Sequence, residues 1–240
     1  PEKRLPVHFG WLYGLAFLAC LTHPALDWLN VYGIRLLEPF SSRWFYGDVL
    51  FIIDVWLWAI LGLGVWLSLR RERQERDWYT PAHRAIALVI AYIALNAAIT
   101  QVQHEIVVGL RDPYPTEAIV APVPLEFWKR EHIVKAHDGR WLSSDWARPS
   151  NIWTYRTSQF DQCLIFSFDR TENDGQLDAF LFWSRAPFAE RAPDGTVLIR
   201  DARFYDPRAR DRFTVALKDV KCEPLNSPTS REGLGVGVRR

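Results

Sequence analysis

The chain has 240 residues, of which 49% are hydrophobic, and its 29 Lys and Arg nearly balance its 28 Asp and Glu, for a net charge of +1. A balance this close to neutral disfavours a nucleic-acid-binding protein that works by neutralising phosphates in bulk. The three cysteines show no CxxC spacing, which excludes a cysteine-based zinc module and a thioredoxin-like redox motif. Nearly all long apolar runs lie before Gln101, so the sequence predicts two unlike halves.

The first apolar run covers residues 7–21 and predicts a helix over about residues 7–30. It follows the basic residues Lys3 and Arg4. About 15 apolar residues before Pro24 is short for a bilayer crossing, so the run fits either a membrane span or a buried or interfacial helix.

A helical hairpin is predicted next. Residues 49–69 read VLFIIDVWLWAILGLGVWLSL, which matches the ~20 residues that cross a bilayer core, and residues 85–104 predict the returning helix. Arginines crowd the connection, namely Arg70, Arg71, Arg73, Arg76 and Arg84. The positive-inside rule places this connection in the cytoplasm and both outer ends of the hairpin outside. Residues 1–109 are therefore expected to form a membrane-embedded helical domain.

Beyond residue 109 the sequence changes to short strand-like runs, and residues 110–222 predict a β-rich soluble domain. A Pro-rich segment, DPYPTEAIVAPVPLEF, favours an extended linker at its start. Three Asp-Gly pairs between strand-like runs predict hairpins, at Asp138-Gly139, Asp174-Gly175 and Asp194-Gly195. Residues 223–240, rich in Ser, Gly and Arg, predict a disordered tail.

The fold class that follows is an α+β membrane protein, with a transmembrane helical amino-terminal half and a small antiparallel β sandwich or barrel. Two of the three cysteines, Cys163 and Cys222, lie in the β-rich part. They either pair as a disulfide, if this part is exported, or stay as buried thiols.

His23 and Asp27 are the first candidates for chemistry. On a helix, side chains four residues apart lie on one face within ~6 Å, so an imidazole and a carboxylate can reach the same metal ion. The alternative is structural: Thr22 caps a helix that begins there, with Pro24 in its first turn, and Asp27 pairs with a nearby arginine.

Three further residues, Arg43, Asp48 and Asp54, are candidates from the next segment. Asp54 is expected six residues inside the second helix, where a charge costs about 2.5–3.5 kcal/mol and is usually functional. Asp48 fits either a helix N-cap or a metal ligand. Arg43 fits either a substrate anion or a position at the membrane interface, where it snorkels to water.

These residues lie in a longer ordered series. THPALDWLNVYG followed by PFSSRWFYGDVLFIID resembles the YdjM-like inner-membrane proteins, which are described as metal-dependent hydrolases. The resemblance extends more loosely through VAPVPLEFWKREHIV and AFLFWSRAPFA, and its strongest part is residues 22–54.

The resemblance implies a metal-dependent hydrolase of the inner membrane that acts at the outer face, with its carboxy-terminal domain outside the cytoplasm. His23 and Asp27 would be metal ligands, Asp54 a third ligand or the partner that orients His23, and Asp48 and Arg43 catalytic. The metal is expected to be zinc, with manganese as the second choice, and the substrate an ester or phosphoester, either a small molecule or lipid-linked. The His-x-x-x-Asp pattern also resembles that of the zinc phospholipase C and P1-type nuclease superfamily.

Family members also carry histidines and acidic residues nearer their amino terminus, and this chain begins at Pro1 without methionine. We therefore expect part of the ligand set to precede Pro1. Two other functions stay open: a non-catalytic membrane anchor whose β domain binds a protein partner, and a proton or ion transporter that uses Asp54.

Overall fold

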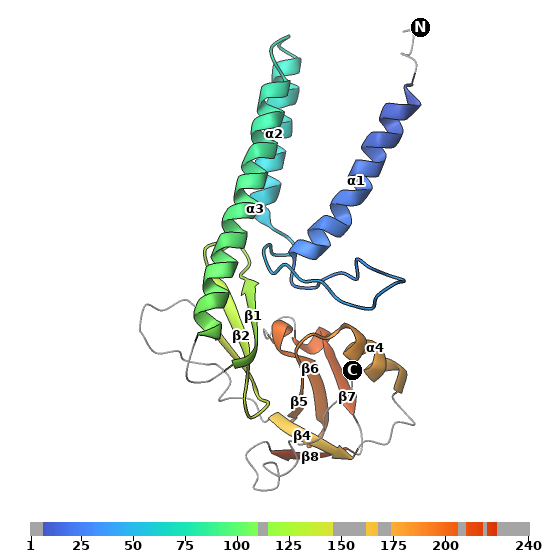
Figure 1. The fold of residues 1–240 in the computed structure, drawn as a ribbon, viewed down its shortest axis with the longest axis vertical. Coiled ribbons are helices and arrows are strands. Elements are labelled where there is room, and N and C mark those ends of the chain that lie inside the picture. The colour runs from blue at the N-terminus through green and yellow to red at the C-terminus, as the bar shows by residue number, and fades with distance from the viewer. Residues whose placement is uncertain are drawn as a thin grey trace. The chain divides into compact units, whose positions relative to one another are not determined.

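The computed structural model describes residues 7–109, 115–145, 162–167, 174–205, 210–217 and 220–224. The chain forms two compact units. We call Pro1–Gln103 with Ala121–Arg130 the helical unit, and His104–Val120 with Glu131–Arg240 the β-rich unit. Helices fill the amino-terminal half and antiparallel sheets the carboxy-terminal half (Figure 1), as the sequence predicts.

The amino-terminal half contains three long helices: α1 (Phe9–Leu29), α2 (Val55–Glu72) and α3 (Tyr79–Val108). Of the described helices, α1 and α3 are long and apolar enough to cross a membrane. No residue of α1 is buried. A mostly exposed apolar helix suits an apolar surrounding such as a bilayer.

The bounds of α2 and α3 differ from the sequence-based expectation because aspartate caps set them. The second helix begins at Val55, six residues later than expected, since the Asp54 carboxylate accepts hydrogen bonds from the backbone N–H groups of Trp56 and Leu57. The placement of Asp54 six residues inside a helix is therefore wrong. The third helix begins six residues earlier than expected, because Asp77 accepts from the N–H groups at positions 79 and 80.

The apolar residues just before Asp54 form a loop that packs on the helices. Val49 and Leu50 are buried against Tyr92 of α3, and both donate their backbone N–H to the carbonyl of Leu29 at the end of α1. The hydrophobicity of Val49 and Leu50 thus reflects packing at the end of the hairpin and not a longer helix.

Helices α2 and α3 lie side by side (Figure 1) and make their closest approach at Gly64. A Cβ atom added there would collide with the Cβ of Ala85 on α3. Gly62, on another face of α2, has nothing within 4 Å of such an atom. Small residues at a helix crossing let the two backbones come close, which is how helices pack in membranes.

Gly64→Ala is expected to destabilise the hairpin by about 1–3 kcal/mol, because the added methyl group pushes α2 away from α3. The matched control Gly62→Ala should be neutral or slightly stabilising, since alanine is the better helix former. Unfolding of the detergent-solubilised protein in increasing dodecyl sulfate measures both. Adding Ala85→Gly to the Gly64→Ala variant should restore its stability. Equal losses of stability at positions 62 and 64 would contradict this packing.

Eight described strands form two sheets. The three-stranded sheet has the order β1-β2-β3 and the five-stranded sheet the order β7-β6-β5-β4-β8. Their bounds are β1 Pro115–Pro122, β2 Arg130–Ala136, β3 Trp141–Asp145, β4 Gln162–Ser167, β5 Pro187–Arg191, β6 Val197–Asp201, β7 Thr214–Leu217 and β8 Lys221–Pro224. Leu177, Val197 and Leu217 belong to the buried apolar cluster of the five-stranded sheet.

Two of the three predicted hairpins are confirmed, and they use the same turn. Gly139 between β2 and β3, and Gly195 between β5 and β6, both have positive φ, at 85° and 88°. In each turn the preceding aspartate, Asp138 or Asp194, accepts a hydrogen bond from the backbone N–H two residues later. The Asp-Gly signal therefore has a local physical cause at both places.

The third predicted hairpin, at Asp174-Gly175, is wrong, because Asp174–Trp183 forms the helix α4. Leu177 is buried in the sheet core, Phe180 packs against that core, and Trp183 stacks on Phe204. These side chains recur every three residues, a helical period that the sequence analysis read as strand.

The structure also differs from the predicted linker and from the predicted start of the tail. The segment expected as an extended linker contains a strand, β1, and the expected tail begins within β8, while residues 225–240 lie outside the described part of the chain. Cys163 on β4 is disulfide-bonded, and Cys20 is free. The backbone of Cys222 on β8 lies opposite Ile165 of β4.

Candidate functional site

His23 and Asp27 lie one turn apart on α1. Nε2 of His23 is 3.4 Å from Oδ2 of Asp27, and the two side chains are 85% and 39% exposed. Thr22 and Pro24 lie inside this helix, which begins at Phe9, so the alternative of a helix starting at Thr22 is wrong. The structure therefore brings a nitrogen and an oxygen donor together on an accessible face.

The described residues contain no group of three or more His, Cys, Asp or Glu side chains that could hold a metal ion. Catalytic zinc sites usually use three protein ligands and keep one position for water. His23 and Asp27 thus fit two positions of such a sphere, and the described part of the chain does not supply the third.

The Asp54 carboxylate is engaged by the fold. Besides capping α2, it accepts the hydroxyl hydrogen of Tyr92, whose Oη lies 3.1 and 2.9 Å from the two carboxylate oxygens. The structure thus gives Asp54 a structural role, joining the start of α2 to the middle of α3.

A polar network continues from Tyr92 and includes residues that the sequence analysis missed. Nδ2 of Asn96 donates to the carbonyl of Tyr92 at 2.9 Å, and the Asn96 carbonyl and side-chain oxygens both accept from Nη2 of Arg130 at 3.0 Å. The sequence holds one signal for Asn96, because it is the one strongly polar residue between Ile86 and Ala98.

Arg130 is 1% exposed and donates five hydrogen bonds, all to uncharged oxygens. Two go to Asn96, one to the Thr100 hydroxyl, and two to the carbonyls of Phe127 and Lys129. Burial lowers the pKa of Arg130 to about 10, which leaves it charged at neutral pH. Arg130 therefore ties residues 121–130 to α3.

Asp48 and Arg43, the two predicted catalytic residues, occupy different surroundings. Asp48 is buried, has a φ of 54°, and accepts the Thr100 hydroxyl with its backbone carbonyl. It is not a helix cap, because Asp54 holds that position. Arg43 is exposed, and its guanidinium carbon lies 5.3 Å from the centroid of the Phe45 ring.

A small pocket opens beside the Asp54 network. Its lining includes the Asp54 and Asn96 residues of the network, and the remaining residues are apolar, namely Phe51, Val55, Trp56, Pro122, Val123, Leu125 and Phe127. The Trp56 indole N–H donates to the carbonyl of Leu125 at 2.8 Å. An apolar hollow with a carboxylate in its wall has the form of a small ligand site.

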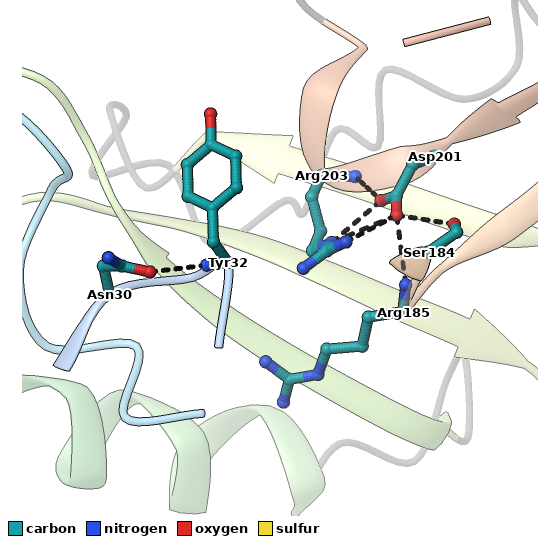
Figure 2. A network of polar contacts seen from close by, with 6 residues as sticks. All are labelled: Asn30, Tyr32, Ser184, Arg185, Asp201 and Arg203. Atoms are coloured by element: carbon teal, nitrogen blue, oxygen red, sulfur yellow. Dashed lines mark hydrogen bonds and ion pairs between the residues drawn. The ribbon is translucent and has the colours of Figure 1, made fainter. Parts of the chain in front are cut away.

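Figure 2 shows polar contacts from each of the two units. In the helical unit, Oδ1 of Asn30 accepts from the backbone N–H of Tyr32 at 2.8 Å and shapes the exit from α1. In the β-rich unit, Asp201 accepts from the Ser184 hydroxyl at 2.6 Å, from the Arg185 N–H at 3.1 Å and from Arg203.

The charges of the Asp201 and Arg203 side chains are both completely buried. Burial alone would raise the pKa of the Asp201 carboxyl, but the hydrogen bonds and charge of Arg203, together with the Ser184 hydroxyl, lower it below its ordinary value. In the same unit, burial lowers the pKa of His132 to about 4, so this ring is neutral at pH 7. Both groups are part of the β-rich core.

Helices of membrane-spanning length and composition, together with antiparallel sheets, place the chain among α+β proteins whose helical part suits a membrane. Residues 3–104 match the model of the family described as YdjM inner membrane protein. This match confirms the resemblance over that segment, and the description of the family supports a location in the inner membrane. Comparisons with curated proteins and with solved structures gave no match.

Proposed function

We propose that this protein is a metal-dependent hydrolase of the inner membrane that cleaves an ester or phosphoester, lipid-linked or small, at the outer face. The observation that carries the proposal is the exposed His23 and Asp27 pair, with donor atoms 3.4 Å apart near the end of α1. The pair lies within the segment that matches the membrane family. No other described arrangement of His and Asp side chains in the helical unit is both close and exposed.

The proposed topology is multi-pass with the carboxy-terminal domain outside the cytoplasm. Arg70, Arg71, Arg73 and Arg76 lie at the connection between α2 and α3, which the positive-inside rule keeps in the cytoplasm. The opposite end of the hairpin, where Asp54 lies, then reaches the outer face. The disulfide bond of Cys163 supports this direction, because disulfides persist in oxidising compartments.

Zinc, or manganese as the second choice, is the metal that we propose His23 and Asp27 hold; when bound, it would lower the pKa of a water molecule and polarise the ester oxygen. His23 would bind as the neutral imidazole. The exposed guanidinium of Arg43 would attract an anionic substrate. Of the two predicted catalytic residues, Arg43 is better placed to meet a substrate than the buried Asp48.

Elemental analysis of the purified, detergent-solubilised protein tests whether it binds a metal ion. The wild type should retain about one zinc or manganese per chain, and His23→Ala/Asp27→Ala should lose at least about tenfold of the metal and of the phosphoesterase activity. His83→Ala is the matched control, because this histidine is far along the chain from His23 and contacts the carbonyl and the ring of Tyr79 within α3. Equal metal and equal activity in all three proteins would contradict the proposal.

A second function, a non-catalytic membrane anchor whose β-rich unit binds a protein partner, is favoured by one observation. The Asp54 carboxylate, a predicted metal ligand, instead caps α2 and accepts from the Tyr92 hydroxyl. Two results together would favour this second function. Neither the wild type nor His23→Ala/Asp27→Ala would contain metal, and the double variant would cross-link to a protein partner as well as the wild type does.

A further inference from the structure

We propose that the pocket beside Asp54 binds the primary ammonium group of a phosphatidylethanolamine headgroup. We call it the headgroup pocket and define it by Phe51, Asp54, Trp56, Asn96, Leu125 and Phe127. The inference goes beyond the hydrolase proposal: it uses the membrane topology given above and does not require a metal at His23 and Asp27.

The charge of the pocket suits a cation that donates hydrogen bonds. Asp54 supplies its one ionisable side chain, and no described Lys, Arg or His forms an ion pair with this carboxylate. The buried Arg130 is close enough for its charge to interact with Asp54, but its guanidinium donates its hydrogen bonds to uncharged oxygens. A carboxylate in an apolar wall is stabilised strongly by a cation that can also donate hydrogen bonds to it.

One carboxylate oxygen of Asp54 has capacity for such a bond. Oδ1 accepts from the N–H groups of Trp56 and Leu57 and from the Tyr92 hydroxyl, whereas Oδ2 accepts from the Tyr92 hydroxyl alone. A carboxylate oxygen can accept two hydrogen bonds. An ammonium N–H can therefore donate to Oδ2 without displacing the cap of α2.

Aromatic residues make up much of the remaining wall. Phe51, Trp56 and Phe127 belong to this wall, and the rings of Trp56 and Phe127 meet edge to face at a centroid separation of 5.9 Å. Aromatic faces attract cations, and a cage of rings with a carboxylate is a common way to recognise an ammonium group. The wall thus fits an ammonium group better than it fits an anion.

The size of the pocket selects among ammonium groups. Its free space of about 10 Å³ corresponds to about one water-sized group. A primary ammonium has this size, whereas the three methyl groups of choline exceed it. The pocket should therefore discriminate phosphatidylethanolamine from phosphatidylcholine.

Neighbouring residues indicate that the pocket lies at the level of lipid headgroups. Leu125 and Trp128, in the segment that forms one wall, are 63% and 51% exposed. Exposed tryptophan at the end of a spanning hairpin is typical of the membrane–water interface. A lipid headgroup is thus the ammonium compound that this pocket would meet at the highest local concentration.

Lipid retention in nanodiscs tests the proposal. The full chain is assembled in nanodiscs of equimolar phosphatidylethanolamine and phosphatidylcholine, extracted, and the co-purified lipids are counted by native mass spectrometry. Asp54→Asn removes the charge and keeps a good N-cap residue. Asp77→Asn is the matched control, because Asp77 caps α3 in the same way at the other end of the hairpin.

The wild type and Asp77→Asn should retain phosphatidylethanolamine over phosphatidylcholine by about fivefold or more, and Asp54→Asn should lose this preference. Phe127→Leu, which keeps the carboxylate and removes one ring, should reduce the preference by about threefold. Equal retention of both lipids by the wild type, or an undiminished preference in Asp54→Asn, would overturn the proposal. His23→Ala/Asp27→Ala should keep the lipid preference, so failure of the hydrolase proposal can be told apart from failure of this one.

Discussion

Arg203→Met is expected to destabilise the β-rich unit by about 3–5 kcal/mol, the usual cost of leaving one charge of a buried ion pair without its partner. Nε and Nη2 of Arg203 donate to the Asp201 carboxylate at 2.8–3.2 Å, and both side chains are inaccessible to solvent. The guanidinium also lies 5.0 Å from the ring centroids of Trp183 and Phe204, so methionine keeps the apolar packing and removes the charge. Pulse proteolysis of the detergent-solubilised full chain in urea measures the free energy of unfolding.

The pH dependence of the same variant should reverse in sign. In the wild type the pKa of Asp201 is lowered in the folded state, so its contribution to stability is present above its unfolded pKa of about 3.9 and is lost as the pH falls through the folded value. Without Arg203, burial raises the folded pKa above the unfolded one, and stability should increase as the pH falls from 7 toward 4.

Asp201→Asn in the Arg203→Met background separates lost charge from lost packing. The neutral amide can still accept from Ser184 and from backbone N–H groups, so the double variant should recover a large part of the stability that Arg203→Met loses. A double variant as unstable as Arg203→Met, with the wild-type pH dependence, would show that the ion pair is not the cause.

Arg130→Met is expected to destabilise the helical unit by about 3 kcal/mol, because it leaves several buried oxygens without a donor at once. The loss should free residues 121–130 from α3 and, through Thr100, weaken the contact with the backbone at Asp48. Hydrogen exchange of the detergent-solubilised protein measures this as faster exchange at residues 47–50 and 92–100.

Lys129→Met is the matched control for Arg130→Met, since it removes a neighbouring positive charge. Lys129 pairs with Glu126 at a partly exposed site, and such pairs are worth about 0–1 kcal/mol. Exchange rates in this variant should stay close to those of the wild type. Equal effects at positions 129 and 130 would mean that the buried network does not hold the helical unit together.

Part of the candidate site follows from local sequence. The spacing of His23 and Asp27 places them on one face of any helix, and α1 has that geometry. The roles of Asp48 and Asp54 could not be predicted from local sequence, because which aspartate caps α2 depends on where that helix starts. The apolar residues 49–53 continue the hydrophobic run of α2, and only the structure shows that Asp54 caps the helix and that Val49 and Leu50 pack against Tyr92 and bond to Leu29 instead.

Arg130 and Tyr92 could not be assigned to a network from sequence. They lie 38 residues apart in the chain, and the hydrogen bonds that connect them run through Asn96. The pocket beside Asp54 likewise combines residues 51–56, Asn96 and residues 122–127, which no local pattern joins.

By itself, the sequence determined the division into an apolar helical half and a β-rich half, the family resemblance, and the two Asp-Gly hairpins, because hydrophobic periodicity and turn chemistry are local properties. The tertiary structure decided where α2 and α3 begin, that Asp174–Trp183 is a helix, and which polar side chains meet Asp54. Those outcomes depend on burial and on hydrogen bonds between segments far apart in the chain, and such energies have no signature within a short stretch of residues.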